Sequence, residues 1–182
     1  MSETNRIDAA GVSLSRAAAP GLVVLRLRAG DTAARGAAAA LLGTALPSGP
    51  AHPVLGAGLD LYWTAPDALL LDAGDADAAR ALVERLASGL AGHHAACHAL
   101  GDARTRFSLA GPAARVLLAK GTGIDLDPRV FAPGMAALTR FAQIPALLVF
   151  RGEAAGYALL ADRPLETYLW DWLADAARSL AP

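Results

Sequence analysis

Two residue types that mark particular classes of protein are scarce in this chain of 182 residues. Lysine occurs once, as Lys120, and charged residues make up only 18 % of the chain. The formal net charge is −1 and the pI is about 6.4. Proteins that bind nucleic acids usually carry a basic excess or a basic stripe. We therefore expect no nucleic-acid partner.

Cysteine is equally scarce, and long apolar runs are missing. Cys97 is the single cysteine, so an internal disulfide is excluded and a reducing compartment is favoured. Apolar runs such as residues 146–150 are far shorter than the ~20 residues that a membrane-spanning helix needs. Residues 1–8 are polar and no apolar stretch follows them, unlike a secretory signal. We expect a cytoplasmic protein with no membrane partner.

The residues that are abundant are apolar. Hydrophobic residues make up 54 % of the chain, and the mean hydropathy is +0.36. This composition excludes a disordered chain, because enough apolar surface is present to offset the entropy of ordering. The few charges cannot cover a small domain, so we expect part of its surface to be apolar and buried against a partner.

The predicted elements fall into two halves after an extension. We expect residues 1–20 to form a polar, alanine-rich N-terminal extension. In residues 21–102, alternation and capping signals predict a strand, a helix, two strands, a helix and a strand, at residues 21–28, 33–42, 59–63, 68–72, 75–90 and 95–100. Asp31 or Thr32 can cap the first helix, and Gly43 ends it.

The second half, residues 103–182, restarts the pattern. It reads as a strand, a helix, three strands and a helix, at residues 104–109, 111–121, 135–142, 146–150, 157–160 and 164–180. We expect Ala113, Val116 and Leu117 to line the buried face of the 111–121 helix. Each half resembles a split βαβ unit of the ferredoxin-like kind, so the sequence predicts an α+β fold of two such halves in one compact domain.

One cluster of side chains has the chemistry of a metal site. His93, His94, Cys97 and His98 lie within six residues, and zinc favours such ligands. A strand that begins near residue 95 would turn alternate side chains to opposite faces, and no second ligand pair has zinc-like spacing. We interpret the four as solvated side chains and leave any ligand of theirs open.

Other catalytic patterns are weak. The serines lack a G-x-S-x-G motif, and the glycines of residues 56–58 and 121–123 lack the rest of a phosphate-binding loop. Asp125 and Asp127 could hold a hard cation, but no third carboxylate is close in sequence. We therefore assign no catalytic, cofactor-binding or metal-binding residue.

The last helix carries a candidate interface residue. On a helical wheel one apolar face would be buried, formed by Leu165, Tyr168, Leu169, Trp172, Ala176 and Leu180. Trp170 falls off this face, and tryptophan is a common anchor of protein interfaces. The alternative is that Trp170 folds back over the edge of its own helix. We expect the first, with Trp170 as an interface residue.

Several segments together resemble the gamma subunits of heterotetrameric sarcosine oxidase. They are residues 42–47 (LGTALP), 102–117, the pair Lys120-Gly121, 125–134 (DLDPRVFAPG) and 168–173 (YLWDWL). The likeness covers roughly residues 25–177 and is most specific at 103–134 and 165–173. Thr122 departs from the family, where a cysteine is frequent. The family belongs with the folate-binding aminomethyltransferase-like proteins, whose fold agrees with the two halves.

The resemblance implies a non-catalytic subunit of an enzyme that oxidatively demethylates sarcosine. The products would be glycine, hydrogen peroxide, and either formaldehyde or methylene-tetrahydrofolate. The implied partners are alpha, beta and delta subunits, which would hold FAD, FMN, NAD, tetrahydrofolate and zinc, with none bound by this chain. Whether sarcosine or another N-methylated amine is the substrate stays open. The alternative is a stand-alone folate-binding protein of the same superfamily, but the chain lacks the Lys-Gly-Cys-Tyr-type motif of the related folate-dependent repair and modification proteins.

Overall fold

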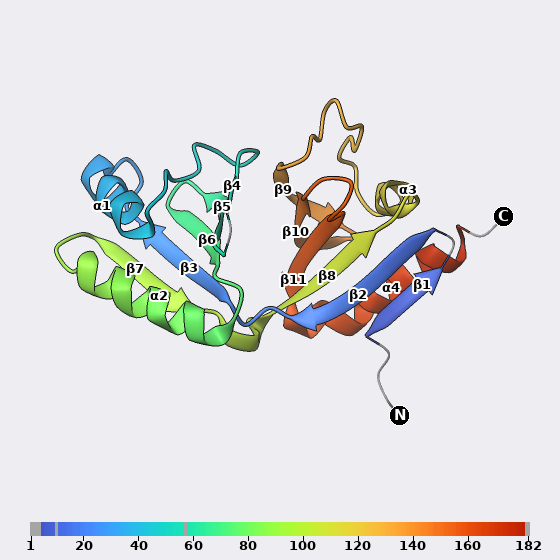
Figure 1. Ribbon diagram of the computed structural model, residues 1–182, viewed down its shortest axis with the longest axis horizontal. Helices are drawn as coiled ribbons and strands as arrows, with labels where there is room; N and C mark the ends of the chain where they lie inside the picture. Colours follow the sequence, from blue (N-terminus) through green and yellow to red (C-terminus); the bar gives the residue numbers. More distant parts are fainter. Residues whose placement is uncertain (1–4, 10, 57, 181–182) are drawn as a thin grey trace. The chain divides into compact units, whose positions relative to one another are not determined.

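The computed structural model describes residues 5–9, 11–56 and 58–180, and the chain divides into two compact units (Figure 1). Unit 1 comprises Met1–Ala18 and Ala103–Pro182, and unit 2 comprises Ala19–Asp102. Each unit contains one antiparallel sheet and two α-helices. Within the described ranges, no helix is long and apolar enough to cross a membrane.

Unit 2 is built on a five-stranded sheet in the order β4-β5-β6-β3-β7. Its strands are β3 (Leu22–Leu27), β4 (Val54–Leu55), β5 (Asp60–Ala65), β6 (Ala68–Asp72) and β7 (Ala95–Ala99), and its helices are α1 (Thr32–Leu42) and α2 (Ala76–Gly89). The Asp31 carboxylate accepts the Ala34 amide at the start of α1, and Gly43 ends the helix at φ +70°. Both features match the expected cap and stop.

The core of unit 2 lies between the sheet and its helices. Alternation along β3 turns Val23, Leu25 and Leu27 to the helix side. There they pack with Leu82 and Leu86 of α2, which both helical spacing and burial place on its inner face. Cys97 of β7 packs against the edge of this core.

Unit 1 is built on a six-stranded sheet in the order β1-β2-β8-β11-β10-β9. Its elements are β1 (Arg6–Ala9), β2 (Val12–Ala18), β8 (Arg104–Ala110), α3 (Ala114–Ala119), β9 (Ala136–Phe141), β10 (Ile144–Phe150), β11 (Tyr157–Asp162) and α4 (Glu166–Arg178), with single 3-10 turns at Gly101–Ala103 and Arg163–Leu165. The alternating strands of the second half thus form where the sequence predicts them.

The residues expected to form an N-terminal extension instead supply two strands of this sheet. β2 pairs antiparallel with β8 from Ser13↔Ala110 to Ala18↔Thr105, and β1 pairs with β2. The physical reason is the alternation of apolar Val12 and Leu14 with Ser13, which lets one face of β2 join the core while the other stays polar.

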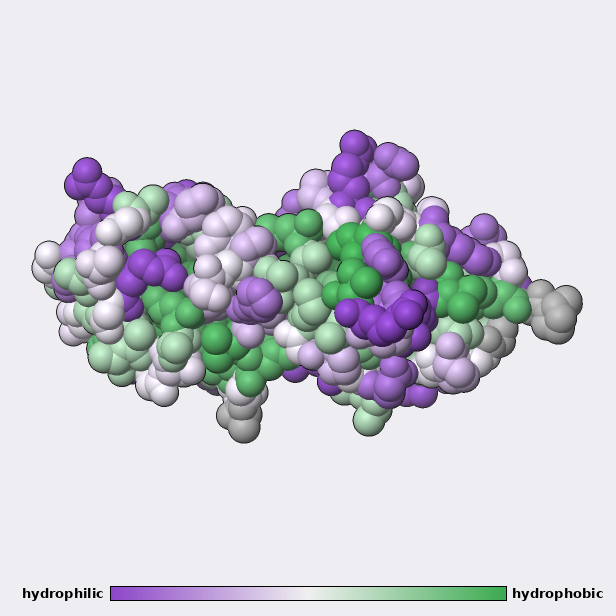
Figure 2. Space-filling view, turned by 90° about the horizontal axis from the view of Figure 1, so that it is seen from above, coloured by the Kyte–Doolittle hydropathy of each residue, from purple (hydrophilic) through white to green (hydrophobic). Residues whose placement is uncertain are grey.

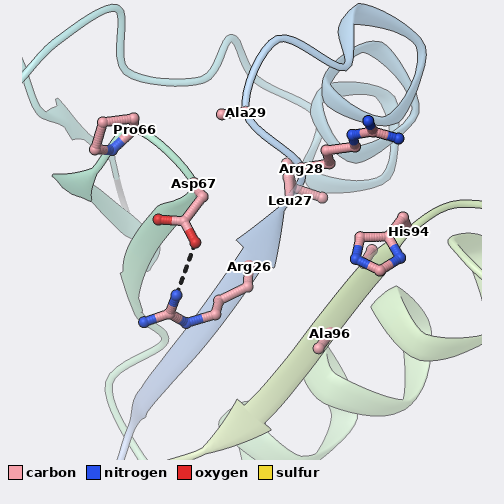
Figure 3. Close-up of a pocket in the computed structure, with 9 residues that line it drawn as sticks. Arg26, Leu27, Arg28, Ala29, Pro66, Asp67, His94 and Ala96 are labelled. Carbon is pink, nitrogen blue, oxygen red and sulfur yellow. Dashed lines mark hydrogen bonds and ion pairs between the residues drawn. The ribbon is translucent and has the colours of Figure 1, made fainter.

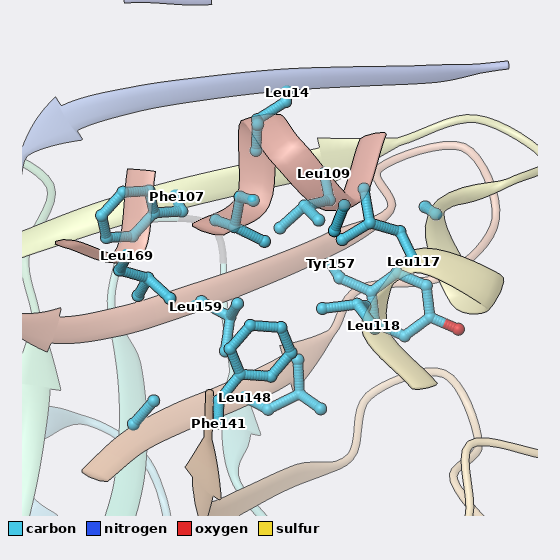
Figure 4. Close-up of a cluster of buried hydrophobic side chains, with 14 of the residues drawn as sticks. Leu14, Phe107, Leu109, Leu117, Leu118, Phe141, Leu148, Tyr157, Leu159 and Leu169 are labelled. Atoms are coloured by element: carbon cyan, nitrogen blue, oxygen red, sulfur yellow. The ribbon is translucent and has the colours of Figure 1, made fainter. Parts of the chain in front are cut away.

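The core of unit 1 lies between this sheet and α3 and α4 (Figure 4). Phe107 and Leu109 of β8, Leu159 of β11 and Leu169 of α4 are fully buried in it. The orientation of α3 differs from the expected one, because Leu117 and Leu118 are buried whereas Val116 is 56 % exposed. The expected face therefore holds for Leu117 and is wrong for Val116.

The predicted α+β fold is confirmed, since the structure has two antiparallel sheets with helices packed on them. In unit 2 the order β5-β6-β3-β7, with α1 and α2 in the crossovers, is the ferredoxin-like arrangement. Unit 1 is a variation on it, because α3 leads from β8 to β9 at the far edge of the sheet and β11 and β10 lie between them.

A close backbone approach in unit 1 gives a test of this packing. Gly156 has φ +70°, and a Cβ there would collide with the Leu109 carbonyl oxygen of β8. We expect Gly156→Ala to lower the free energy of unfolding by about 2 kcal/mol, since both backbone strain and a clash oppose the new methyl group. Gly123→Ala is the control, because its surroundings are open and its φ is not positive. Chemical denaturation measures both variants, and equal stabilities would contradict this packing.

Candidate functional site

The histidine and cysteine cluster lies at the start of β7, and the strand separates its members. His93 and His94 precede β7, and Cys97 and His98 belong to it. Cys97 packs against the helix side of the sheet, whereas the exposed His98 lies on the opposite face. Among the residues that the structure describes, no group of three or more His, Cys, Asp or Glu side chains is placed to hold a metal ion.

The environment of Cys97 disfavours its thiolate. Burial raises the pKa of the Cys97 thiol, because the charged form loses solvation. Its Sγ also donates a hydrogen bond of 3.5 Å to the Val83 carbonyl oxygen of α2. Since the thiolate is the nucleophile, a raised pKa lowers the reactive fraction of this thiol.

This environment leads to a prediction about alkylation. At pH 8 we expect iodoacetamide to modify Cys97 of the folded chain several times more slowly than Cys97 of the urea-unfolded chain. The rate in the folded chain should rise as the pH passes above the usual range of a free thiol. Mass spectrometry of the alkylated fraction over time measures both rates, and equal rates would contradict the raised pKa.

The two carboxylates of the 124–134 loop serve the loop itself. The Asp125 carboxylate accepts the Asp127 amide at 2.9 Å, and Asp127 forms an ion pair of 2.7 Å with Arg129. Hydrogen bonds from Arg129, from its side chain first and its backbone second, lower the pKa of Asp127. These contacts hold the turn, and both oxygens of Asp127 take part in them.

The predicted exposure of Trp170 is wrong. Its side chain is only 7 % exposed and packs in the core of unit 1 with Leu169 and Leu173. The guanidinium carbon of Arg16 lies 4.9 Å from the centre of its ring, within the range of a cation–π contact. Trp172, expected to be buried, is only partly buried and packs edge-on against Phe141. The interface prediction rested on an exposed Trp170 side chain, and this side chain is buried instead.

A buried cluster of charged and polar side chains in unit 1 escaped the sequence patterns. Arg16 and Glu166 face each other at 3.5 Å with side chains 6 % and 17 % exposed, and Arg163 contacts the same carboxylate at 2.6 Å. The Thr105 hydroxyl donates to Glu166 at 2.8 Å. No spacing motif could reveal the cluster, because β2, β8, the 3-10 turn before α4 and α4 itself supply its members from distant parts of the chain.

The surface of the chain carries both apolar and polar side chains. Figure 2 shows apolar areas interspersed with polar ones on one face of the molecule. Among the described residues, four large apolar side chains are exposed, namely Val116, Val130, Leu138 and Tyr168. They belong to α3, the 124–134 loop, β9 and α4, all in unit 1.

A pocket of unit 2 lies at the end of β3 and the start of β7 (Figure 3). Its volume is about 600 Å³, and its polar lining consists of Arg26, Arg28, Asp67 and His94. Figure 3 shows Arg26 and Asp67 on one side, joined by an ion pair of 2.7 Å, and Arg28 and His94 on the other. Within the described residues, neither Arg28 nor His94 has a side-chain hydrogen bond or ion pair. The pocket thus offers positive charge to a ligand.

Known proteins resemble this chain along most of its length. The family model described as "Sarcosine oxidase, gamma subunit family" matches residues 26–179. A sarcosine oxidase subunit gamma from Arthrobacter sp is 35 % identical over 153 residues, which are 82 % of this chain and 72 % of the relative. Another, from Corynebacterium sp. (strain P-1), is 32 % identical over 124 residues, which are 68 % of this chain and 59 % of the relative.

Solved structures give the same result. A chain of the heterotetrameric sarcosine oxidase from Corynebacterium sp. U-96, in complex with pyrrole 2-carboxylate, matches with a TM-score of 0.86 and 29 % identity. The match covers 97 % of this chain and 88 % of that one. Aminomethyltransferase T of the glycine cleavage system from Bartonella henselae matches with a TM-score of 0.60 over 88 % of this chain and 45 % of that one, at 19 % identity, which shows a shared fold alone. The resemblance drawn from the sequence is confirmed, and the chain belongs to the sarcosine oxidase gamma subunit family.

Proposed function

We propose that this chain is the gamma subunit of a heterotetrameric sarcosine oxidase. The observation that carries the proposal is the structural match over 97 % of the chain to the heterotetrameric enzyme of Corynebacterium sp. U-96. The family match over residues 26–179 supports it independently, because it rests on the sequence. The reaction of the assembly would be the oxidative demethylation of sarcosine to glycine, with hydrogen peroxide and either formaldehyde or methylene-tetrahydrofolate as the other products.

The partners would be alpha, beta and delta subunits, and we propose that the cofactors belong to them. These cofactors would be FAD, FMN, NAD, tetrahydrofolate and zinc. The role of this chain would then be to hold the assembly together. In support, three carboxylates serve contacts within the chain, since Glu166 pairs with Arg16, Asp67 with Arg26 and Asp127 with Arg129.

Co-expression tests the proposal. We expect the tagged chain to co-purify in equal stoichiometry with alpha, beta and delta subunits that are co-expressed with it. We expect the purified assembly to oxidise sarcosine with release of hydrogen peroxide, measured by a coupled peroxidase assay. Failure of the wild-type chain to co-purify, or an assembly that is equally active without it, would contradict the proposed function.

Titration of the isolated chain tests the proposed absence of an active site. Under this proposal, tetrahydrofolate, FAD, FMN and Zn²⁺ give no saturable heat in isothermal calorimetry at micromolar protein. Stoichiometric binding of tetrahydrofolate would instead favour a stand-alone folate-binding protein. Comparison of sarcosine with other N-methylated amines in the steady-state assay identifies the substrate of the assembly.

A further inference from the structure

The edge of unit 2 formed by β7 is open to an added strand. β7 is the last strand of the order β4-β5-β6-β3-β7, so it pairs on one side only, with β3. The Arg28 amide donates to the His94 carbonyl, and the Leu100 amide donates to the Leu22 carbonyl. Because hydrogen-bonded pairs alternate in an antiparallel ladder, the amides and carbonyls of Cys97 and Ala99 point away from β3.

This edge lacks the devices that protect most sheet edges. The sequence of β7 is AACHA, with no lysine, arginine, acidic residue or proline, and its pairing with β3 is regular over five residue pairs. Natural edges are usually short, charged or bulged, because an open edge recruits other strands. The other edges follow that rule, since β4 has two residues, β1 carries Arg6 and Asp8, and β9 carries Arg140.

The two sides of this edge differ in chemistry. On the helix side, a groove of about 270 Å³ is lined by Leu86, Leu90 and small residues, with His93 and His98 at its margin. On the other side, the 600 Å³ pocket presents Arg28 and His94, while its acidic residue Asp67 is already paired with Arg26. A strand beside β7 would alternate in the same way, with one side chain toward the groove and the next toward the positive charge.

We propose that β7 accepts an extended segment of a partner oxidase subunit as an additional strand. The segment alternates apolar and acidic side chains, with a carboxylate placed between Arg28 and His94 (Figure 3). Charge complementarity selects this occupant, because the pocket has positive charge without an acidic partner among the described residues. Backbone hydrogen bonds to Cys97 and Ala99 supply affinity, as in other cases of strand addition. The inference rests on the proposed function and specifies the contact through which it acts.

Two variants test the edge and the charge separately. Ala99→Pro removes an outward amide and places a ring on the open side, without altering a hydrogen bond to β3. Arg28→Glu reverses the charge at an exposed position. The control for Ala99→Pro is Leu138→Pro, which removes an amide that points away from the sheet on the outer side of β9. The control for Arg28→Glu is Arg85→Glu, which reverses an exposed charge on α2.

Binding to the co-expressed alpha, beta and delta subunits is measured by surface plasmon resonance, after circular dichroism shows that each variant is folded. We expect Ala99→Pro and Arg28→Glu each to weaken binding by about tenfold or more, and both controls to bind like the wild type. Hydrogen exchange tests the edge without a mutation, since the Cys97 and Ala99 amides should become protected in the assembly.

The outcomes separate the two proposals. If the wild-type chain does not bind the other subunits, the proposed function fails and this inference fails with it. If the wild-type chain binds but the variants bind equally well, or the two amides exchange unchanged, only the β7 inference is overturned. If Ala99→Pro abolishes a dimer of the isolated chain and leaves subunit binding intact, the occupant is a second copy, which also overturns it.

Discussion

Trp170→Ala is expected to destabilise the isolated chain by about 3 kcal/mol or more, the cost typical of deleting a large buried aromatic side chain. The ring is 7 % exposed and fills part of the core of unit 1 beside Leu169 and Leu173. Its loss also removes the cation–π contact that accompanies the buried guanidinium of Arg16. Thermal and chemical unfolding of the purified variant measure the effect.

Trp172→Ala is the matched control from the same helix. Trp172 is only partly buried, and its ring meets Phe141 edge-on with centroids 5.1 Å apart. Because less apolar area leaves the core, we expect a loss of about 1–2 kcal/mol. A larger loss for Trp172→Ala than for Trp170→Ala would mean that α4 presents the face inferred from its hydrophobic wheel. That wheel is off by about a quarter turn from the face that is buried.

The error in the orientation of α4 has a physical cause. Ala174 and Ala177, which lie outside the expected face, are buried in α4 together with Trp170. A helical wheel gives large apolar residues more weight than alanine. It therefore places Tyr168 and Trp172 on the buried face. In a chain so rich in alanine, the packing face depends on shape as well as on hydrophobicity.

The features that the sequence did predict are local. Alternation in β3 and the capping of α1 by Asp31 and Gly43 depend on neighbouring residues, and both are present in the structure. The pairing of β2 with β8 and the contact of Arg16 with Glu166 instead join opposite ends of the chain. Contacts between residues that are far apart in the chain produce no periodic pattern in a single sequence. Resemblance to a family was therefore needed for the function, whereas periodicity sufficed for most elements.

Glu166→Ala is expected to lower the free energy of unfolding by about 3 kcal/mol. The Glu166 carboxylate is the anion that Arg16, Arg163 and Thr105 share. Its removal leaves the Arg16 guanidinium, whose side chain is 6 % exposed, without this carboxylate, and removes the acceptor of the Thr105 hydroxyl. A buried charge that loses a paired carboxylate costs more than a broken surface ion pair, because water reaches the site poorly and cannot replace the lost partner.

Two further variants distinguish this cause from a general loss of packing. Glu153→Ala breaks the ion pair of 2.8 Å with Arg115, but the Glu153 side chain is 78 % exposed, so we expect a loss of less than about 1 kcal/mol. In the double variant Arg16→Met with Glu166→Leu both charges are absent, and we expect stability closer to that of the wild type than to that of Glu166→Ala. Chemical denaturation at pH 7 measures all of these variants. If the double variant were as unstable as the sum of its single variants, the loss of the Glu166 carboxylate from Arg16 would not be the cause of the destabilisation.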